Sequence, residues 1–596
     1  MERKWNRIAV IVARDKLTIL GQSTEGTNSA LISIDRVNLD NISETSLENT
    51  ESDNHLVNGS VVTGVGLVGF LQLQGAIFLG IITKAVIAGY IGDHTVWSVS
   101  EVEWIPVNFG INSPTTTDQR HLSLISNLFR ASDFYFSYTY DLCCEYFKWN
   151  YLHMQKFRAK NFSQSWDLDL MCGSFRSVDF DSLGRAFNFS LICRRSPHFA
   201  GTRYRKRGLN VDGFCANEVE TEQILVAYGP PHHIMTFKQV RGSVPLHWSQ
   251  ASHGLVPKPE IVIHHRDLNL DSTRKHFENL IFRYGSPIKA VSLLSRGHHV
   301  HKTSTESGLA QEYNNAITYM KQVVGEEISL DEFDLKGAVV GDSGTSTPST
   351  IEPIHSSMYT EARELAVRLV RECGWMWRGG SVEKNQKGII RTNCVDCLDR
   401  TSIFQYIVGL HALSEQLIAL GVLDHPLRPS WVHDTSARRS PEITSNQTLL
   451  PLIEEIFETC SDQLSYQYAG TATHKKYAAD AMHGQSGTAK AKRGFLNEIF
   501  ISLGRHYSSS FTDTDKQNAL NLFLGLYTDV MEEVAVYEDV CNVENVDRWV
   551  HSRPVADREC PMRPASFCSP ITSLPKNRYN SLNAQRIGNM RHISFS

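Results

Sequence analysis

Cys394 and Arg400 are the two residues of this sequence whose types and spacing best suit a chemical reaction. Five residues separate them in a stretch from Gly388 to Gln405 that reads GIIRTNCVDCLDRTSIFQ. A thiolate is a strong nucleophile, and the planar guanidinium of arginine binds two phosphoryl oxygens at once. The pair therefore predicts attack on a phosphate ester through sulfur, with a cysteinyl-phosphate on Cys394 that water then hydrolyses.

The loop between these two residues also offers proton donors and phosphate ligands. Asp396 and Asp399 are the candidates for the general acid that a poor leaving group requires, although either carboxylate could instead accept hydrogen bonds from loop N–H groups. Thr401 is expected to cap the following helix, and its hydroxyl could also contact Cys394. The predicted phosphate-binding residues are Asn393, Val395, Cys397, Leu398 and Thr401.

A strand, a loop and a helix are expected to position this site. Gly388 to Ile390 reads as a short strand, and an apolar-periodic helix begins near Thr401. The positive end of that helix and the loop N–H groups would lower the pKa of the thiol and bind phosphate. A second helix is predicted upstream, because apolar residues recur at helical spacing from Ala362 to Cys373 and Gly374 ends the pattern. This α/β pattern places Cys394 at the carboxyl end of a strand.

A run of six cations lies about 200 residues before the loop, with no acidic residue inside the run. One interpretation is a solvated surface loop, since basic runs are usually exposed. The other is contact with phosphate, either of a substrate headgroup or of an anionic bilayer. The residues concerned are Arg194, Arg195, Arg203, Arg205, Lys206 and Arg207.

The length of 596 residues exceeds what one core supports, so several domains are expected. Short strands dominate the beginning of the chain and predict a β-rich (α+β) N-terminal domain over residues 1–186. An α/β catalytic domain would follow over residues 187–527. Residues 528–596 form an acidic segment and then a basic tail, which we expect to be disordered. Between His551 and Ser596 the tail holds seven Lys or Arg residues against two acids, a net charge of +5 that could favour anionic membranes.

The composition excludes some other classes of protein. With 41% hydrophobic residues, 21% charged residues and a net charge of -5, the chain is typical of soluble globular proteins, and nothing indicates nucleic-acid binding. Thr63 to Gly92 is apolar, but Gln72, Gln74 and Lys84 interrupt it, so buried strands fit better than a membrane span.

The twelve cysteines are scattered, and no signal-peptide pattern is present, which indicates a reducing cytosolic setting. Cys394 and Cys397 also match the CxxC pattern of a zinc half-site or a redox dithiol. No second CxxC occurs in the sequence, so zinc is disfavoured. A redox motif would be expected at the start of a compact thioredoxin-sized unit and not at residue 394, so a redox dithiol is disfavoured as well. We therefore expect no metal and no cofactor.

The string RTNCVDCLDRT, from Arg391 to Thr401, resembles the signature of the Sac-domain phosphoinositide phosphatases. Further stretches resemble that family in the same order along the chain. The resemblance implies a β-rich N-terminal Sac domain packed on the α/β catalytic domain. It also implies metal-independent dephosphorylation of phosphatidylinositol phosphates, with Cys394 as nucleophile and Arg400 as phosphate binder. The further stretches are Phe134 to Leu142, Arg194 to Arg203, Ala216 to Gln223, Arg241 to Gln250, Tyr468 to Thr471 and Asp515 to Gln517.

Two positions depart from the family pattern. Ser402 stands where the family commonly has Asn, and Leu335 follows Asp334 where many members have His. The tail also lacks the paired transmembrane helices of the reticulum-resident members, and no inositol 5-phosphatase domain follows. We therefore expect a soluble, Sac-only member that is cytoplasmic and peripheral on endomembranes of the reticulum, Golgi or endosomes.

The leading hypothesis is a phosphatase acting on phosphatidylinositol 4-phosphate first and the 3-phosphate next, with phosphoinositide lipids and an anionic membrane surface as partners. The alternative is a catalytically idle module that binds phosphoinositides or organises a complex. A protein-tyrosine phosphatase is a third reading, but Asn393 rather than His precedes Cys394.

Overall fold

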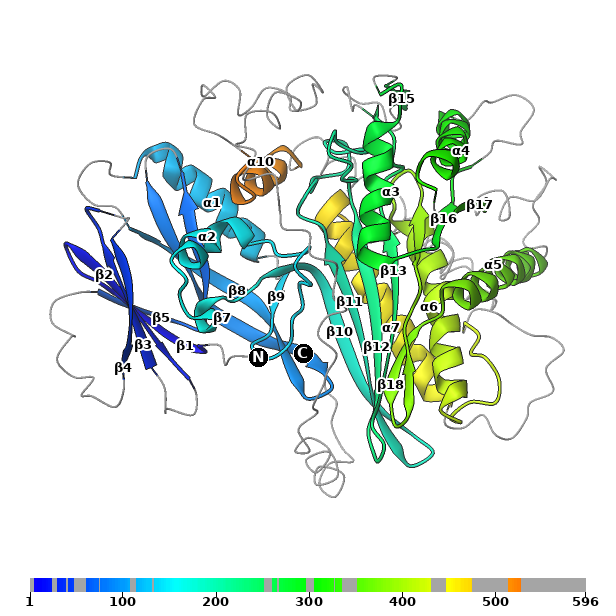
Figure 1. Cartoon of the computed structure of the whole chain (residues 1–596), viewed down its shortest axis with the longest axis horizontal. Coiled ribbons are helices and arrows are strands. Elements are labelled where there is room, and N and C mark those ends of the chain that lie inside the picture. The colour runs from blue at the N-terminus through cyan, green and yellow to red at the C-terminus, as the bar shows by residue number, and fades with distance from the viewer. Residues whose placement is uncertain are drawn as a thin grey trace, which may run out of the picture.

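A computed structural model gives the architecture of the chain. It describes residues 5–23, 29–38, 41–47, 60–73, 76–107, 114–130, 133–250, 260–264, 267–295, 305–325, 327–334, 351–429, 446–473 and 513–526. The predicted tail over residues 528–596 and the departure at Leu335 lie outside these ranges. Within them the chain folds as a mixed α/β protein with a β-rich N-terminal part, as the sequence predicts (Figure 1).

The N-terminal part opens with a five-stranded antiparallel sheet in the order β4-β3-β2-β1-β5. Alternating apolar residues form its core, because successive side chains of a strand point to opposite faces. In β2, for example, Leu17 and Ile19 are buried whereas Lys16 is exposed. The strands are β1 Arg7–Val12, β2 Lys16–Gln22, β3 Ser29–Asp35, β4 Ile42–Leu47 and β5 Ser60–Gly64.

A thirteen-stranded mixed sheet runs through the rest of the molecule. Its path is β17-β16-β20-β13-β12-β11-β10-β9-β8-β7-β6, with β18 and β19 paired off β13. The apolar stretch from Thr63 to Gly92 contains the end of β5 and all of β6 and β7, which confirms the prediction of strands. The strands are β6 Gly66–Gln72, β7 Ile77–Ile91, β8 His94–Pro106, β9 Phe134–Phe136, β10 Met171–Ser182, β11 Arg185–Arg195, β12 Val219–Ala227, β13 His233–Arg241, β16 Ile288–Ser292, β17 Ile328–Glu332, β18 Met376–Gly379, β19 Val382–Lys384 and β20 Ile389–Asn393. A two-stranded ribbon joins β14 Trp248–Ser249 to β15 Val262–Ile263.

Helices cover both faces of this sheet around β13 and β20 (Figure 1). On one face α5 Ile351–Cys373, α6 Asp399–Ala419 and α7 Asn446–Ala469 share a core with β11, β12, β13 and β20. On the other face α3 Asp271–Tyr284 and α4 Thr305–Val323 pack on β13, β16 and β20. The predicted helix from Ala362 lies within α5 and ends at Gly374, whose positive φ of 68° suits the stop.

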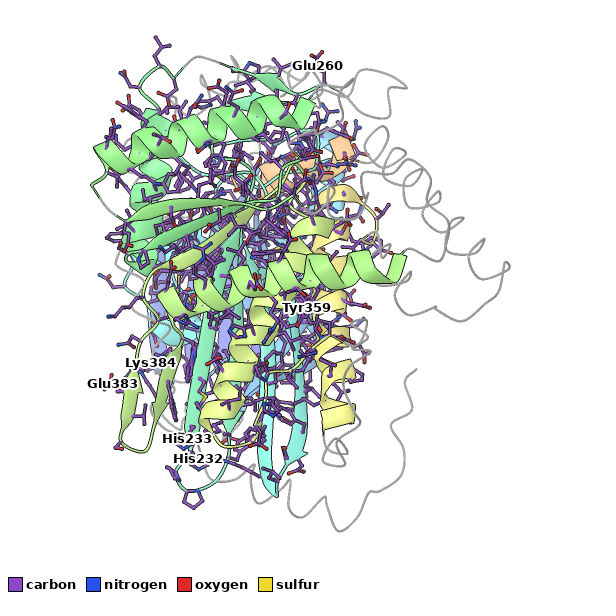
Figure 2. All side chains as sticks on the ribbon, turned by 90° about the vertical axis from the view of Figure 1, so that its right-hand side faces the viewer. His232, His233, Glu260, Tyr359, Glu383 and Lys384 are labelled. Atoms are coloured by element: carbon purple, nitrogen blue, oxygen red, sulfur yellow. The ribbon has the colours of Figure 1, made fainter. Side chains whose placement is uncertain are left out.

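The ends of the sheet can be followed in Figure 2. His232 and His233, at the start of β13, lie at the same end as Glu383 and Lys384 of the β18–β19 hairpin. Glu260 lies at the opposite end. The carboxyl end of β13, and with it that of its parallel neighbour β20, therefore lies away from His233.

The late helix α10 Asp513–Phe523 packs mainly on the N-terminal part of the chain (Figure 1), and its Lys516 also donates to the Tyr466 carbonyl of α7 at 2.8 Å. Its apolar residues join the core of α1 Thr116–Arg130, and Phe523 contacts Phe129 and Phe134 edge to face. The His153 ring on α2 Tyr151–Ala159 also bonds the Phe523 carbonyl at 2.7 Å.

The predicted boundary between residues 186 and 187 falls within β11, and the division into domains stays a prediction. Among the helices in the described ranges, none combines the length and the apolarity that crossing a membrane requires.

Candidate active site

The loop of residues 394–398 connects β20 directly to α6. β20 pairs in parallel with β13 on one side and with β16 on the other, so the loop leaves the carboxyl ends of three parallel strands. This confirms the predicted strand, loop and helix. The helix begins at Asp399 with Leu398 at the N-cap, so the prediction that Thr401 caps it is wrong.

Cys394 lies at the start of the loop with its sulfur held by two donors. The residue is 2% exposed; the Thr401 hydroxyl donates to Sγ at 3.3 Å and the Cys397 N–H donates at 2.9 Å. Burial opposes ionisation, but the hydrogen bond with Cys397, the charge of Arg400 and the Thr401 hydroxyl together lower the pKa of Cys394 to about 6. These contacts therefore favour the thiolate form of Cys394 at neutral pH.

Cys397 has the opposite character, although it lies three residues further along the same loop. Its Sγ donates to the Gly242 carbonyl at 2.8 Å, and its backbone adopts a positive φ of 51°. Burial and the neighbouring Cys394 raise the pKa of Cys397 well above its ordinary value. The pair thus divides into a thiolate at Cys394 and a thiol at Cys397.

Asp396 is clasped by two arginines of the basic run. Arg203 reaches both carboxylate oxygens, at 3.0 and 2.6 Å, and Arg207 reaches Oδ1 at 2.6 Å. Burial opposes its ionisation, yet the two guanidinium groups hold the pKa of Asp396 far below its usual range. A carboxylate that stays ionised at neutral pH cannot donate a proton, so the structure argues against Asp396 as general acid.

Asp399 is the first residue of α6 and is partly exposed. It lies one residue before Arg400 and two before Thr401, the donor to Cys394. Of the two predicted acids, it is the one that Arg203 and Arg207 do not bind.

Arg400 points toward α4 and the end of β16. Its Nη1 donates to the Leu293 carbonyl at 2.6 Å and to Glu306 at 2.9 Å, and Nη2 contacts the other Glu306 oxygen at 3.4 Å. Sequence reasoning missed Glu306, because 94 residues separate it from Arg400 and no local pattern marks it. The predicted phosphate-binding guanidinium is ion-paired in this structure.

The first half of the basic run lies in the interior. The Arg194 side chain is 0% exposed and pairs with Glu220 and Glu222, each at 2.7 Å. Arg195 is buried and donates to the Gly201 carbonyl. The prediction that Arg194 and Arg195 contact a headgroup or membrane is therefore wrong, because both side chains are buried and Arg194 pairs with acids of the neighbouring strand, which lie outside the local sequence.

The second half of the run supports the loop. Arg207 donates to the Val395 carbonyl at 2.8 Å in addition to its contact with Asp396. Lys206 is buried against the Phe199 ring, and Arg205 donates to Thr514 at 2.7 Å. Only Arg203 combines loop contact with partial exposure within this half, at 19% of its side chain in the described structure.

The other predicted phosphate-binding residues, Asn393 and Leu398, are buried and support the loop. The Asn393 amide oxygen accepts from Arg391 at 3.4 Å. The Leu398 side chain packs against Tyr468 and Ala469. The Tyr468 hydroxyl donates to the Lys206 carbonyl at 2.9 Å, which ties the loop to the basic run.

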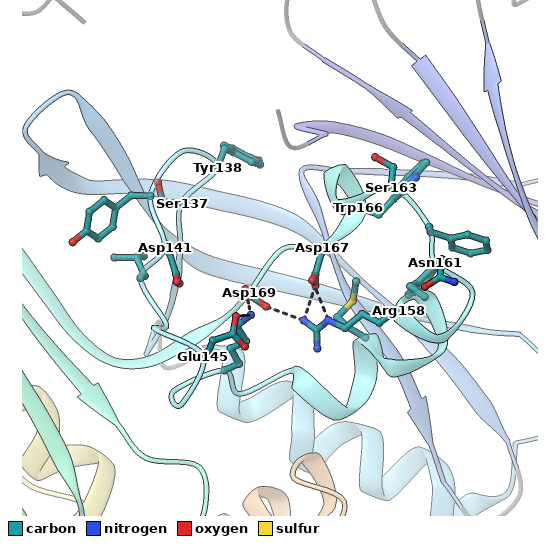
Figure 3. Close-up of a pocket in the computed structure, with 16 residues that line it drawn as sticks. Ser137, Tyr138, Asp141, Glu145, Arg158, Asn161, Ser163, Trp166, Asp167 and Asp169 are labelled. Atoms are coloured by element: carbon teal, nitrogen blue, oxygen red, sulfur yellow. Dashed lines mark hydrogen bonds and ion pairs between the residues drawn. The ribbon is translucent and has the colours of Figure 1, made fainter. Parts of the chain in front are cut away.

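A pocket of about 470 Å³ lies elsewhere, between the segment from Ser137 to Glu145 and α2 (Figure 3). Its charged lining is largely paired internally, since Arg158 bridges Asp167 and Asp169. No residue predicted for the phosphate chemistry lines this pocket.

Comparison with known proteins finds relatives of this chain. The profile of the SacI homology domain matches residues 65–339. The phosphoinositide phosphatase SAC2 of Arabidopsis thaliana is 32% identical over 80% of this chain and 65% of its own length. The phosphatidylinositol-3-phosphatase SAC1 of Arabidopsis thaliana is 28% identical over 79% of this chain and 58% of its own length. The polyphosphoinositide phosphatase of Schizosaccharomyces pombe is 29% identical over 81% and 57%.

The chain thus spans less than two thirds of the length of these relatives, between 57% and 65%. Because the match with SAC2 covers 80% of this chain, it must include the loop that follows β20, although the SacI homology profile ends at residue 339. This chain carries a SacI homology domain and is similar over about four fifths of its length to Sac-domain phosphoinositide phosphatases.

Proposed function

We propose that this protein removes phosphate from phosphatidylinositol phosphates through a cysteinyl-phosphate on Cys394. The observation that carries the proposal is the Cys394 sulfur, which two donors and a pKa of about 6 make a thiolate at the carboxyl end of β20. Only the thiolate attacks phosphorus efficiently. The relatives named as phosphoinositide phosphatases supply the substrate class.

The first step joins the Cys394 sulfur to phosphorus while the bond from phosphorus to the ring oxygen breaks. Asp399 gives its proton to that oxygen, because an inositol alkoxide is a poor leaving group. In the second step Asp399 takes a proton from water, the water oxygen bonds to phosphorus and the sulfur leaves as thiolate. Thr401 stabilises that thiolate by its hydrogen bond, and Arg400 stabilises the charge on the phosphoryl oxygens.

The substrate would be presented by a membrane. We infer that phosphatidylinositol 4-phosphate is the preferred substrate and that the 3-phosphate ranks second. One relative is named for the 3-phosphate. Arg203 is suited to meet the headgroup, because it is partly exposed and touches the loop through Asp396. Binding would be peripheral, on the anionic cytoplasmic face of an endomembrane.

A second candidate function is phosphoinositide binding without turnover. The observation in its favour is the ion pair between Arg400 and Glu306, which occupies the guanidinium that the transition state needs. If that pair persists with substrate bound, the pocket would hold phosphate and release none.

Phosphate release from short-chain phosphoinositides, measured across the mono- and bis-phosphorylated lipids, tests both candidates. The wild type should release phosphate, and Cys394→Ser should lower the rate by at least about a thousandfold. Cys373→Ala is the matched control, because Cys373 is a buried free thiol on α5 outside the loop, and it should retain activity. Equal rates for the wild type and Cys394→Ser would contradict the cysteinyl-phosphate mechanism. Liposome binding without release by the wild type would favour the binding module.

A further inference from the structure

Glu306 contacts the arginine of the catalytic loop but takes no part in the two steps of the proposed reaction. It lies in the first turn of α4, with Oε2 at 2.9 Å from Arg400 Nη1 and Oε1 at 3.4 Å from Nη2. Both side chains are largely buried, since Glu306 is 15% exposed and Arg400 is 11% exposed. A carboxylate this close to the arginine either competes with the phosphate of the substrate or positions the arginine to receive it.

The donors that Arg400 uses distinguish these two roles. A guanidinium carries five N–H donors, two on each Nη and one on Nε. Nη1 uses both of its donors, one on the Leu293 carbonyl at 2.6 Å and one on Glu306. Nη2 uses one donor on Glu306, and Nε donates to no residue in the part of the chain that the structure describes. One N–H of Nη2 and the N–H of Nε therefore remain for a ligand.

These two remaining donors lie on one edge of the guanidinium. Glu306 binds the end of the group, between Nη1 and Nη2, so the other N–H of Nη2 lies on the side of Nε. Because the group is planar, this N–H and that of Nε point the same way, as a fork that can bind two phosphoryl oxygens. Burial opposes the charge of Arg400, but Cys394 and then Glu306 raise the pKa of Arg400. The guanidinium thus interacts with the nucleophile and with Glu306 at the same time.

The end of β16 holds both the carboxylate and the loop. The Ser295 N–H donates to Glu306 Oε2 at 3.0 Å, so the carboxylate has a support besides Arg400. The Leu293 N–H donates to the Asn393 carbonyl at 2.9 Å, while the Leu293 carbonyl accepts from Arg400. Asn393 directly precedes the nucleophile. One short segment therefore fixes the beginning of the loop, its arginine and the partner of that arginine.

We propose that Glu306 is a positioning residue of the phosphatase site, which holds Arg400 by one edge and leaves its Nε and Nη2 edge to bind the phosphate. The carboxylate stays on Arg400 when substrate binds and is not displaced by it. An arginine held in this way has already lost its rotational freedom, so it meets the phosphoryl oxygens without rearranging. The inference rests on the proposed function, because it takes phosphate as the ligand of Arg400.

The experiment measures binding separately from turnover. Short-chain phosphatidylinositol 4-phosphate is titrated by calorimetry into the full chain carrying Cys394→Ser, which cannot form the cysteinyl-phosphate. Adding Glu306→Ala should weaken binding about 10- to 100-fold, because Arg400 is no longer held for two charge-assisted hydrogen bonds. Glu312→Ala is the matched control at the other glutamate of α4, and it should change the affinity by less than about twofold.

A double variant separates positioning from a purely structural role of Glu306 in α4. In a protein that also carries Arg400→Ala, Glu306→Ala should cause no further weakening, because no guanidinium remains to be held. A structural role would weaken binding equally with and without Arg400, and that result would overturn the proposal. Glu306→Gln keeps one oxygen for an Arg400 donor and should lose less affinity than Glu306→Ala. It also provides the comparison should Glu306→Ala fail to fold.

Tighter binding by Glu306→Ala would overturn the proposal as well, because the carboxylate would then be a competitor of the phosphate. Unchanged binding would show that Arg400 needs no partner, with the same consequence. A wild type that binds the lipid and releases no phosphate would refute the proposed phosphatase. The affinities of the Cys394→Ser proteins would still decide the role of Glu306 in that case.

Discussion

The basic run has two halves, Arg194 with Arg195 and then Arg203 to Arg207. Both halves are rich in arginine, but their arginines have different roles. Arg194 lies in the interior of the sheet, where Glu220 and Glu222 neutralise it. Arg203 and Arg207 leave the sheet and clasp Asp396 in the catalytic loop. Both halves use arginine and carboxylate at hydrogen-bond distance. The partner, not the cation, therefore distinguishes a structural ion pair from one that shapes the site.

The largest expected effect tests whether Arg203 and Arg207 prevent Asp396 from acting as the general acid. If Arg203 and Arg207 keep Asp396 ionised, Asp399 is the proton donor, and Asp399→Asn should lower kcat about 10²- to 10⁴-fold on phosphoinositides. An aryl phosphate has a good leaving group, so the loss should shrink with that substrate. Asp396→Asn is the control, and its loss should be the same for both substrates. The reverse pattern would assign the proton to Asp396.

Replacing Arg194, in the first half of the run, should lower the stability of the fold rather than the catalytic rate. Arg194→Met leaves two buried carboxylates whose nearest remaining cation among the described residues is Lys238, at 3.6 and 3.7 Å. We expect the free energy of unfolding to fall by about 3–5 kcal/mol, measured by urea denaturation. The exposed Arg14 provides the control, since Arg14→Met should change it by less than about 0.5 kcal/mol. A stable but inactive Arg194→Met protein would contradict this assignment.

Replacing Arg207, in the second half of the run, should lower activity rather than stability. Arg207→Met takes away the donor to the Val395 carbonyl and one of the two partners of Asp396. The displaced loop should lose about a hundredfold in kcat/KM. Arg205→Met, a change in the same run at a residue that bonds Thr514 instead, should have a much smaller effect. Equal losses for the two variants would remove the distinction between Arg207 and its neighbours.

The smallest effect concerns the pH profile. Because the pKa of Cys394 is depressed to about 6, the acid limb of the kcat/KM profile should fall about tenfold per pH unit below that pH. The same sign holds for stability: the contribution of the thiolate is present above the ordinary thiol pKa and is lost as pH falls through about 6. Thr401→Val removes one donor and should move the acid limb upward. A wild-type limb near pH 8.5 would mean that the loop does not activate its thiol.

Sequence reasoning succeeded where the determining interactions are local. Apolar spacing predicted α5 and its stop at Gly374, and the order of strand, loop and helix around Cys394. It could not distinguish Asp396 from Asp399, because the arginines that separate them are 193 and 189 residues away. Glu306 was missed for the same reason, since it approaches Arg400 only after α4 packs beside β16.

The packing of α10 has a consequence for synthesis on the ribosome. Phe523 completes an aromatic cluster with Phe129 and Phe134, and Gln517 accepts a hydrogen bond from the Thr202 N–H. Chains emerge from the amino end, so these early residues leave the exit tunnel hundreds of residues before their partners. The apolar residues of α1 and β9 that α10 covers in the finished protein therefore lack this cover until α10 has been translated.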